Sequence, residues 1–269
     1  MQPMVTIALR AAREAEQLIS RAIDRPDLLR VRERSPNQYV TNVDRKAEEI
    51  IIETLQVNFP NHSYLGEESG LHEGSGDEKE YLWIIDPLDG GNNFVRGIPH
   101  FAISIACQLY GRIVHAVIVD PIRHEEFTAS RGDGAQINDT RIRVTDRRSL
   151  EGAVLGTGLP IASPPVVIDA QAEAAKFLQQ QGADIRQSGC GSLDLAYVAA
   201  GRLDALWLLN LSQWQTAAGS LIVTEAGGLV SDFNGGQKHI EEGNLVTATP
   251  KCFKPLLQAV QRSLGPALD

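Results

Sequence analysis

The sequence predicts an α/β protein in which helices and mixed strands are stacked in layers. In several segments, apolar residues recur every three to four positions, which is typical of amphipathic helices. Other segments are short apolar runs bounded by Gly, Pro and Asp, and these indicate strands. Because the two kinds of segment alternate along the chain, a layered α/β architecture is favoured.

The first part of the chain predicts two helices. Residues 3–23 place their apolar side chains on one helical face, and a polar loop follows at 34–38. A second helix is predicted from Thr41 to about residue 60. Thr41 and Asp44 have the spacing of a capping box, with Asp in place of the usual Glu or Gln, so we expect this helix to begin there.

Strands replace helices from residue 63 onward. Short apolar runs predict strands at 81–85, 100–109, 113–119, 126–129 and 142–144, with a tight turn at 137–139. Near residue 150 the pattern changes again and indicates a second lobe. Its predicted strands are 153–156, 184–187 and 205–208, and its helices are 169–180, 192–201, 215–226 and a last one from Pro255, with further short strands between them. We expect an N-terminal α/β lobe at 1–148 and a C-terminal α/β lobe at 149–269.

The composition excludes several classes of protein. The chain has 269 residues, and no stretch is long and apolar enough to cross a bilayer or to act as a signal peptide. Its three cysteines are scattered, which favours reduced thiols and a cytoplasmic location over a disulfide framework. The formal net charge of −9 argues against direct nucleic-acid binding, which needs a basic surface. An acidic balance also suits a protein that gathers carboxylates around a divalent cation.

One segment combines an apolar strand with two aspartates. Residues 83–94 read WIIDPLDGGNNF, so Asp86 and Asp89 stand at the end of the strand and before a turn rich in Gly and Asn. Carboxylates beside a loop that presents several N–H groups make a site for Mg²⁺ and a phosphate. The alternative is an ordinary Asp-rich turn, because Asp, Gly and Asn are common turn residues.

Two further segments indicate a function only when they are considered together with the first. Residues 66–70 (GEESG) form an acidic loop, which alone would be a solvated surface loop. Residues 214–219 (WQTAAG) lead into 225–228 (EAGG), which alone would be a tightly packed helix with a glycine cap. Taken together and in this order, the three segments resemble the inositol monophosphatase family, and they are closest to its bacterial SuhB branch. The resemblance covers nearly the whole chain and implies the inositol monophosphatase fold, with alternating α-β-α-β-α layers.

The resemblance implies Mg²⁺-dependent hydrolysis of phosphate monoesters of inositol and related sugars by two cations. The first cation would be held by Glu67, Asp86 and the carbonyl of Leu88, with Glu67 and Asp86 as catalytic residues. The second would be held by Asp86, Asp89 and the residue after the late tryptophan. The family has an aspartate there, whereas this chain has Gln215. Its neutral amide oxygen can still coordinate a cation, but it brings no charge to the site.

On the substrate side, the phosphate would rest on the backbone of Gly90, Gly91 and Asn92. The family has a threonine at the position of Gly91, where its hydroxyl orients the attacking water. Leu208 stands where the family has an acid that contacts the inositol hydroxyls, and an apolar side chain cannot accept those hydrogen bonds. Gln215 and the missing hydroxyl at Gly91 together predict hydrolysis weakened by on the order of 10²- to 10⁴-fold, and Leu208 further weakens recognition of inositol.

Two functions therefore remain open. The first is a slow phosphatase that acts on inositol-1-phosphate or another small sugar phosphate, within a homodimer of the family type. The second is a catalytically inactive factor that docks on RNA polymerase and Nus factors in ribosomal RNA transcription antitermination, as the resemblance to the SuhB branch implies. The second hypothesis predicts an intact fold in which catalytic residues have been replaced.

Overall fold

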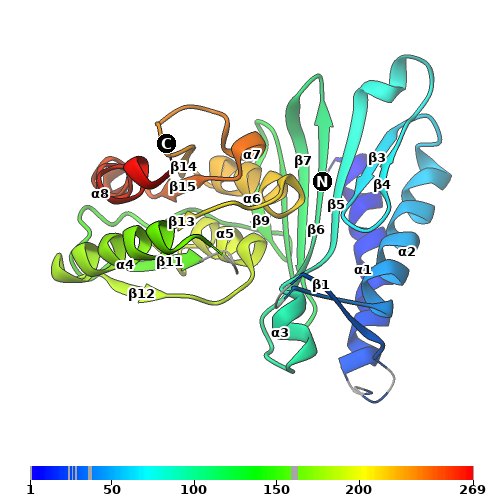
Figure 1. The fold of residues 1–269 in the computed structure, drawn as a ribbon. Helices are drawn as coiled ribbons and strands as arrows, with labels where there is room; N and C mark the ends of the chain where they lie inside the picture. Colours follow the sequence, from blue (N-terminus) through cyan, green and yellow to red (C-terminus); the bar gives the residue numbers. More distant parts are fainter. Residues whose placement is uncertain are drawn as a thin grey trace.

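The computed structural model of the chain describes residues 2–23, 25, 27, 29–35, 38–158 and 163–268. Helices and sheets alternate in layers, in the order α-β-α-β-α (Figure 1). The helices are α1 (Pro3–Ile23), α2 (Asn42–Asn58), α3 (Gly91–Val95), α4 (Pro165–Gln180), α5 (Gly191–Ala199), α6 (Gln213–Glu225), α7 (His239–Glu242) and α8 (Pro250–Leu268). The strands are β1 (Val31–Ser35), β2 (Gln38–Thr41), β3 (Ser63–Gly66), β4 (Gly70–His72), β5 (Tyr81–Asp89), β6 (Ala102–Leu109), β7 (Arg112–Asp120), β8 (Glu125–Ser130), β9 (Gly134–Ile137), β10 (Thr140–Arg141), β11 (Val154–Gly158), β12 (Asp184–Arg186), β13 (Ala205–Leu208), β14 (Leu229–Ser231) and β15 (Leu245–Ala248).

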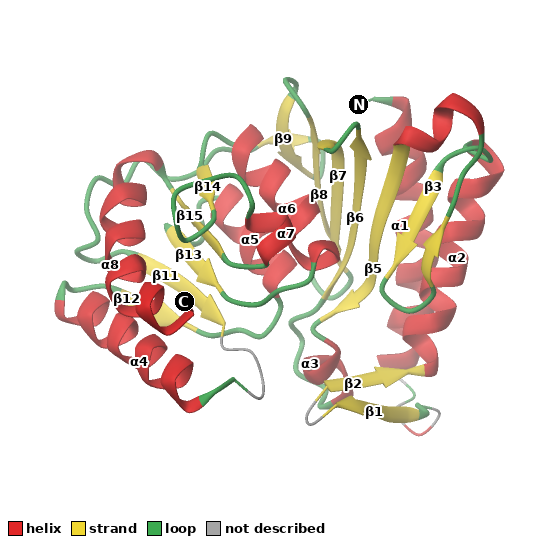
Figure 2. Ribbon diagram, turned by 45° about the horizontal axis from the view of Figure 1, so that its top comes forward, coloured by secondary structure: helices red, strands yellow, loops and turns green. Residues whose placement is uncertain are grey.

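Two sheets form the β layers. The larger one has eight strands in the order β10-β9-β8-β7-β6-β5-β3-β4, and only its β3–β5 pair is parallel. The smaller one has five strands in the order β12-β11-β13-β15-β14, with β11 parallel to both of its neighbours. The ribbon of β1 and β2 stands apart from both sheets, beside α3 (Figure 2).

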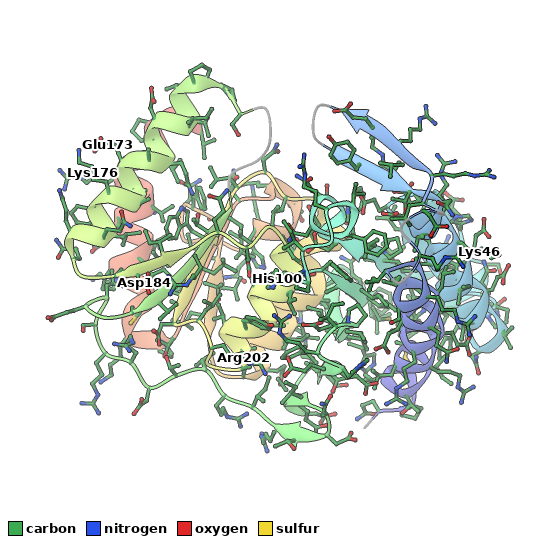
Figure 3. All side chains as sticks on the ribbon, turned by 90° about the horizontal axis from the view of Figure 1, so that it is seen from below. Lys46, His100, Glu173, Lys176, Asp184 and Arg202 are labelled. Carbon is green, nitrogen blue, oxygen red and sulfur yellow. The ribbon has the colours of Figure 1, made fainter. Side chains whose placement is uncertain are left out.

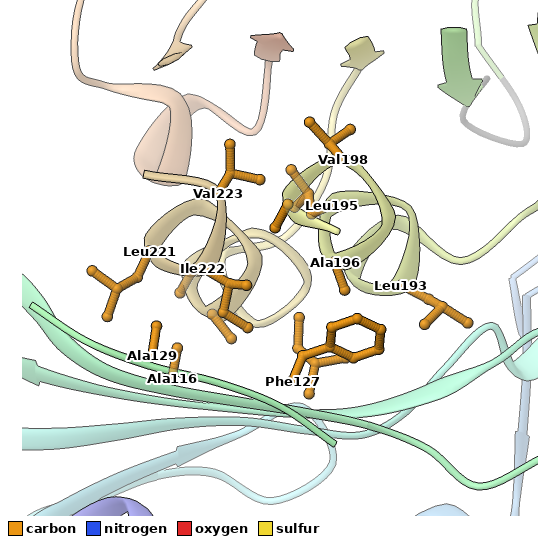
Figure 4. Close-up of a cluster of buried hydrophobic side chains, with 14 of the residues drawn as sticks. Ala116, Phe127, Ala129, Leu193, Leu195, Ala196, Val198, Leu221, Ile222 and Val223 are labelled. Carbon is orange, nitrogen blue, oxygen red and sulfur yellow. The ribbon is translucent and has the colours of Figure 1, made fainter. Parts of the chain in front are cut away.

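Three hydrophobic cores fill the spaces between the layers. The first lies between the pair α1 and α2 and one face of the larger sheet. The second lies between the two sheets, where α5 and α6 are buried on all sides, and the third lies under α4 and α8. In the middle core, Phe127 and Ala129 of the larger sheet face Leu193, Ala196 and Ile222 of the helices (Figure 4).

The larger sheet comes from residues 63–141 and the smaller from 154–248. The middle core joins side chains from both segments, so the two halves share buried surface. The boundary between an N-terminal and a C-terminal lobe at residues 148 and 149 remains a prediction.

Most of the helices arise where the sequence predicts them. α1 spans the predicted 3–23, and α2 begins at Thr41 with the expected capping box. In this box, Thr41 Oγ1 accepts a hydrogen bond from Val43 N at 3.0 Å, and Asp44 Oδ2 accepts one from Thr41 N at 2.9 Å. Two backbone N–H groups at the helix start are satisfied in this way.

Two element predictions were wrong. Residues 142–144 do not form a strand; instead, Val144 N–H donates to Ala226 O at the end of α6, at 3.1 Å. The sheet ends earlier, at β10, after a turn in which Asn138 and Asp139 have φ values of 45° and 63°. The last helix begins at Pro250 and not at Pro255. Proline is favoured in the first turn of a helix, so Pro255 predicted a start, although here it lies inside the helix.

The outer surface carries isolated ion pairs. Lys176 and Glu173 lie on α4 at one end of the layered molecule, and Lys46 lies on α2 at the other end (Figure 3). Exposed pairs of this kind contribute little to stability. None of the described helices combines the length and the apolar character that crossing a membrane requires.

A buried histidine makes the stability of the protein depend on pH. The His62 ring is stacked between Phe59 and Tyr81, at centroid distances of 4.8 and 4.6 Å, and its Nδ1 accepts a hydrogen bond from Trp83 Nε1 at 3.0 Å. Burial lowers the pKa of His62 below its usual value of 6.5, so the folded protein holds the ring neutral. Protonation then favours the unfolded chain.

We expect the free energy of unfolding to fall as pH drops below about 6.5, because the unfolded chain then binds a proton at this histidine more readily than the folded chain does. His62→Gln keeps a side-chain acceptor for Trp83 but cannot be protonated. Urea unfolding at pH 7.5 and pH 5.5 should therefore show a smaller pH effect in the variant than in the native protein. An equal pH effect in both proteins would show that His62 does not couple folding to protonation.

Candidate functional site

A single cavity of about 470 Å³ lies where the two sheets meet, and it brings together all of the predicted site residues. These residues are Glu67, Asp86, Leu88, Asp89, Gly90, Gly91, Asn92, Leu208 and Gln215. They come from the loop after β3, from the end of β5, from α3, from the end of β13 and from the first turn of α6. The cavity is large enough for a small ligand.

The end of β5 delivers both aspartates to this cavity. The strand is buried along most of its length, and its register with β6 shifts between Asp86 and Asp89, where Pro87 interrupts the backbone donors. Gly90 then turns the chain into α3 with φ of 93°. A Cβ at this position would lie 3.0 Å from the carbonyl oxygen of His100, so glycine satisfies both the backbone angle and the close approach.

The loop that carries Glu67 is held by a buried carboxylate of α2. Glu48 accepts hydrogen bonds from the backbone N–H groups of Glu68 and Ser69, both at 2.8 Å. The same carboxylate lies against Gly66, where a Cβ would come within 2.4 Å of Glu48 Cδ. Glycine at position 66 therefore lets α2 approach the loop closely and hold it in place.

We expect Glu48→Gln to lower the free energy of unfolding by about 1–3 kcal/mol, because an NH₂ group would then face a backbone N–H. Glu49→Gln is the matched control, since Glu49 is exposed on the same helix. Urea unfolding of the two variants measures the difference. Equal stability in the two variants would contradict the role of Glu48 in holding the loop.

Asp86, which is buried, and Glu67, which is partly exposed, form a pair of carboxylates that fits a divalent cation. Asp86 is fully buried, and its Oδ1 accepts a hydrogen bond from Leu88 N at 3.1 Å. Among the described residues, nothing donates a hydrogen bond to its Oδ2. Burial, together with the negative charges of Glu67 and Asp89, holds the pKa of Asp86 well above its usual value. Burial also raises the pKa of Glu67 to about 7.

A positive guanidinium borders this pair. Arg34 of β1 donates to Glu67 Oε1 at 3.3 Å and to Glu68 Oε1 at 2.5 Å. It partly offsets the charge of the acidic loop, yet Asp86 Oδ2 stays without a donor. Oxygen ligands with uncompensated negative charge are what Mg²⁺ prefers, so the residues of the first cation position fit the ion.

The residues of the second cation position do not fit. Asp89 Oδ2 accepts hydrogen bonds from Ser192 N at 2.8 Å, Ser192 Oγ at 2.7 Å and Cys190 Sγ at 3.2 Å. Its Oδ1 accepts one from Gln215 Nε2 at 3.0 Å, while Gln215 Oε1 accepts one from Ser212 N at 3.1 Å. This geometry does not favour the ligand role predicted for Gln215.

Two of the predicted substrate-side residues, Gly91 and Leu208, offer no polar side chain to a substrate. A Cβ at Gly91 would lie 3.0 Å from the carbonyl oxygen of Tyr39, so a side chain there would require the backbone of β2 to move by a few tenths of an ångström. Leu208 is 2% exposed and belongs to the middle core. Asn92 Oδ1 accepts a hydrogen bond from Arg96 Nε at 3.3 Å. No hydroxyl is available at position 91 to orient a water.

Sequence reasoning missed several residues of the cavity wall, above all those of α5. Asp194 is 3% exposed and accepts hydrogen bonds from Ser188 Oγ at 2.5 Å and from His100 Nε2 at 3.3 Å. Figure 3 places His100 at the centre of the molecule. Burial raises the pKa of Asp194. The segment 193–202 resembles the SuhB branch, but nothing local in it indicates that Ser192 reaches Asp89, which lies 103 positions away in the chain.

Comparisons with known proteins give similar sequences and structures along nearly the whole chain. The model of the inositol monophosphatase family matches residues 1–265. The chain is 54% identical over 269 residues to the Nus factor SuhB of Pseudomonas aeruginosa, covering 100% of the chain and 99% of that protein. It is 44% identical over 268 residues to the Nus factor SuhB of Escherichia coli K12, covering 100% of the chain and 99% of that protein. The crystal structure of the extragenic suppressor protein suhB from Bartonella henselae is also similar, with a TM-score of 0.93, 39% identity and coverage of 97% of this chain and 99% of that one.

Proposed function

Because this chain belongs to the inositol monophosphatase family, we propose that it is a docking factor of the transcription machinery and that hydrolysis is not its main task. The relatives above carry the name Nus factor and align with this chain from end to end. By that likeness, its partners would be RNA polymerase and Nus factors during antitermination. The formal net charge of −9 suits contacts with proteins better than contacts with RNA.

The observation that carries this proposal is the close contact between Gly91 and the backbone of Tyr39. Tyr39 O lies 3.0 Å from the place where a Cβ would stand, so the ribbon of β1 and β2 packs directly on the glycine. A side chain that orients the attacking water has no room there without a shift of the backbone. The layered fold has three well-packed cores, so it can present a docking surface even if hydrolysis in the cavity is slow.

In vitro transcription tests this function. A template that carries a ribosomal RNA leader and a downstream terminator is transcribed by RNA polymerase with purified Nus factors, with and without this chain. We expect the chain to raise the fraction of transcripts that read through the terminator. Unchanged read-through over a concentration series of the chain would contradict the proposal.

Residual hydrolysis of a small sugar phosphate is the second candidate, and the unsatisfied Asp86 Oδ2 favours it. Glu67, Asp86 and the carbonyl of Leu88 would hold one Mg²⁺. When bound, Mg²⁺ supplies positive charge that stabilises a phosphoryl group in the transition state. The chain would contribute the backbone of Gly90, Gly91 and Asn92 toward the phosphate, while Leu208 offers no hydrogen bond to a polyol.

Release of phosphate from inositol-1-phosphate measures this activity. A typical enzyme turns over about 10 times per second, and a loss on the order of 10²- to 10⁴-fold leaves about 10⁻¹ to 10⁻³ per second. We expect a rate in this range that depends on Mg²⁺. A rate near 10 per second would make hydrolysis the main function.

A further inference from the structure

The carboxylate of Asp89 is surrounded by neutral hydrogen-bond donors. Its Oδ2 faces Ser192 N, Ser192 Oγ and Cys190 Sγ, although the single thiol proton of Cys190 is shared with the Asp89 backbone oxygen at 3.3 Å. Its Oδ1 accepts one hydrogen bond, from Gln215 Nε2. Asp89 is also 4% exposed, which leaves it little access to water. The charge of Asp89 is thus stabilised without any cation.

The orientation of the Gln215 amide follows from its two partners. Ser212 N can only donate a hydrogen bond, so the amide oxygen must face it, at 3.1 Å. The NH₂ group must then face Asp89 Oδ1, at 3.0 Å. Rotating the amide by half a turn would place N–H against N–H and oxygen against oxygen, and both hydrogen bonds would be lost. The capping box of α6 therefore holds the Gln215 NH₂ group on Asp89.

We infer that Gln215 excludes the second cation and turns a two-cation cavity into a cavity for one. A hard cation needs oxygen ligands, and here the partial positive charge of an NH₂ group occupies the approach to Asp89 Oδ1. The same hydrogen bond ties the start of α6 to the end of β5, a link that a cation would otherwise make. This inference concerns the cavity of the proposed hydrolase, but its test does not depend on turnover or on docking.

Calorimetric titration of the whole chain with Mn²⁺ tests the inference through the number of bound ions. Gln215→Glu is the sharpest variant, because it keeps the length of the side chain and the oxygen that caps α6, and it replaces only the NH₂ group by oxygen. We expect Gln215→Glu to bind one Mn²⁺ more than the native chain, and Gln215→Asp to do the same. Gln213→Glu adds the same charge on the same helical turn, and Gln213 is not among the described residues that line the cavity. We expect this control to bind as the native chain does.

Thermal unfolding supplies a second readout. In EDTA, Gln215→Glu brings two carboxylates together at Asp89 and should melt below the native chain, and Mn²⁺ should reverse that loss. Two bound ions in the native chain would overturn the inference, even if no variant folds. Equal numbers of ions in the native chain and in a folded Gln215→Glu would also overturn it. If the native chain binds none and the variant binds one, the exclusion of a cation by Gln215 holds, but the statement that the cavity holds one cation fails together with the proposed first cation position.

Discussion

Asp86→Asn is expected to raise the free energy of unfolding of the metal-free protein by about 2 kcal/mol, because a buried acceptor without a donor costs about 1–3 kcal/mol. In the native chain, Asp86 Oδ2 has no described donor, and the neighbouring charges of Glu67 and Asp89 repel it. An amide at this position removes one negative charge and can donate a hydrogen bond to Glu67. The measurement is urea unfolding in EDTA.

Mg²⁺ should reverse the order of stability. An ion that binds only the folded chain stabilises it by about 2.7 kcal/mol at 100 times its dissociation constant, whereas Asp86→Asn should gain little. Asp232→Asn is the control, because Asp232 accepts three backbone hydrogen bonds, from Asn234, Gly236 and Lys238. We expect this control to be destabilised in both conditions. A loss of stability in metal-free Asp86→Asn would contradict the conclusion that Asp86 Oδ2 is a buried acceptor without a donor.

Gly219→Ala is expected to destabilise the protein by about 2–3 kcal/mol, because it overfills the contact between α5 and α6. A Cβ at Gly219 would lie 2.4 Å from Leu195 Cβ, which is fixed by the backbone and cannot rotate away. Both residues lie in or beside the middle core, where α5 brings Ser192 and α6 brings Gln215 to Asp89. Separation of the two helices would also loosen these hydrogen bonds.

Gly265→Ala provides the matched control. Gly265 lies in α8, and a Cβ there would meet nothing within 4 Å. The helical gain of alanine over glycine is offset here because Gly265 precedes Pro266, which disfavours helical angles for a residue with a Cβ, so this variant should differ little from the native protein. Thermal unfolding should show a clear loss for Gly219→Ala and a small shift for Gly265→Ala. A neutral Gly219→Ala would mean that α5 and α6 are packed less closely than the structure shows.

The sequence predicted those parts of the fold that depend on local patterns. The capping box of Thr41 and Asp44 involves neighbouring residues, and so the start of α2 was predicted correctly. The ribbon of β1 and β2 was missed because its residues 31–34 are exposed, and a strand without a buried face shows no apolar alternation. Small residues at 217–219 were interpreted as a closely packed helix, which is where α5 approaches α6.

The candidate cavity could be predicted as a set of residues, but its chemistry could not. Every predicted site residue lines it, because family motifs mark positions along the chain. The hydrogen bonds that satisfy Asp89 join residues more than 100 positions apart, and no local pattern reports them. For the same reason, the sequence suggested that the oxygen of Gln215 could coordinate a cation, whereas the fold directs that oxygen to Ser212.

Transcription with the Asp86→Asn variant tests most directly whether the chain acts through its scaffold. The variant should lack Mg²⁺-dependent release of phosphate, and its unfolding curve serves as the check that it is folded. The account predicts that it raises read-through of the terminator as much as the native chain does at equal concentration. Loss of read-through in a folded Asp86→Asn would contradict the account and place the function in the chemistry of the cavity.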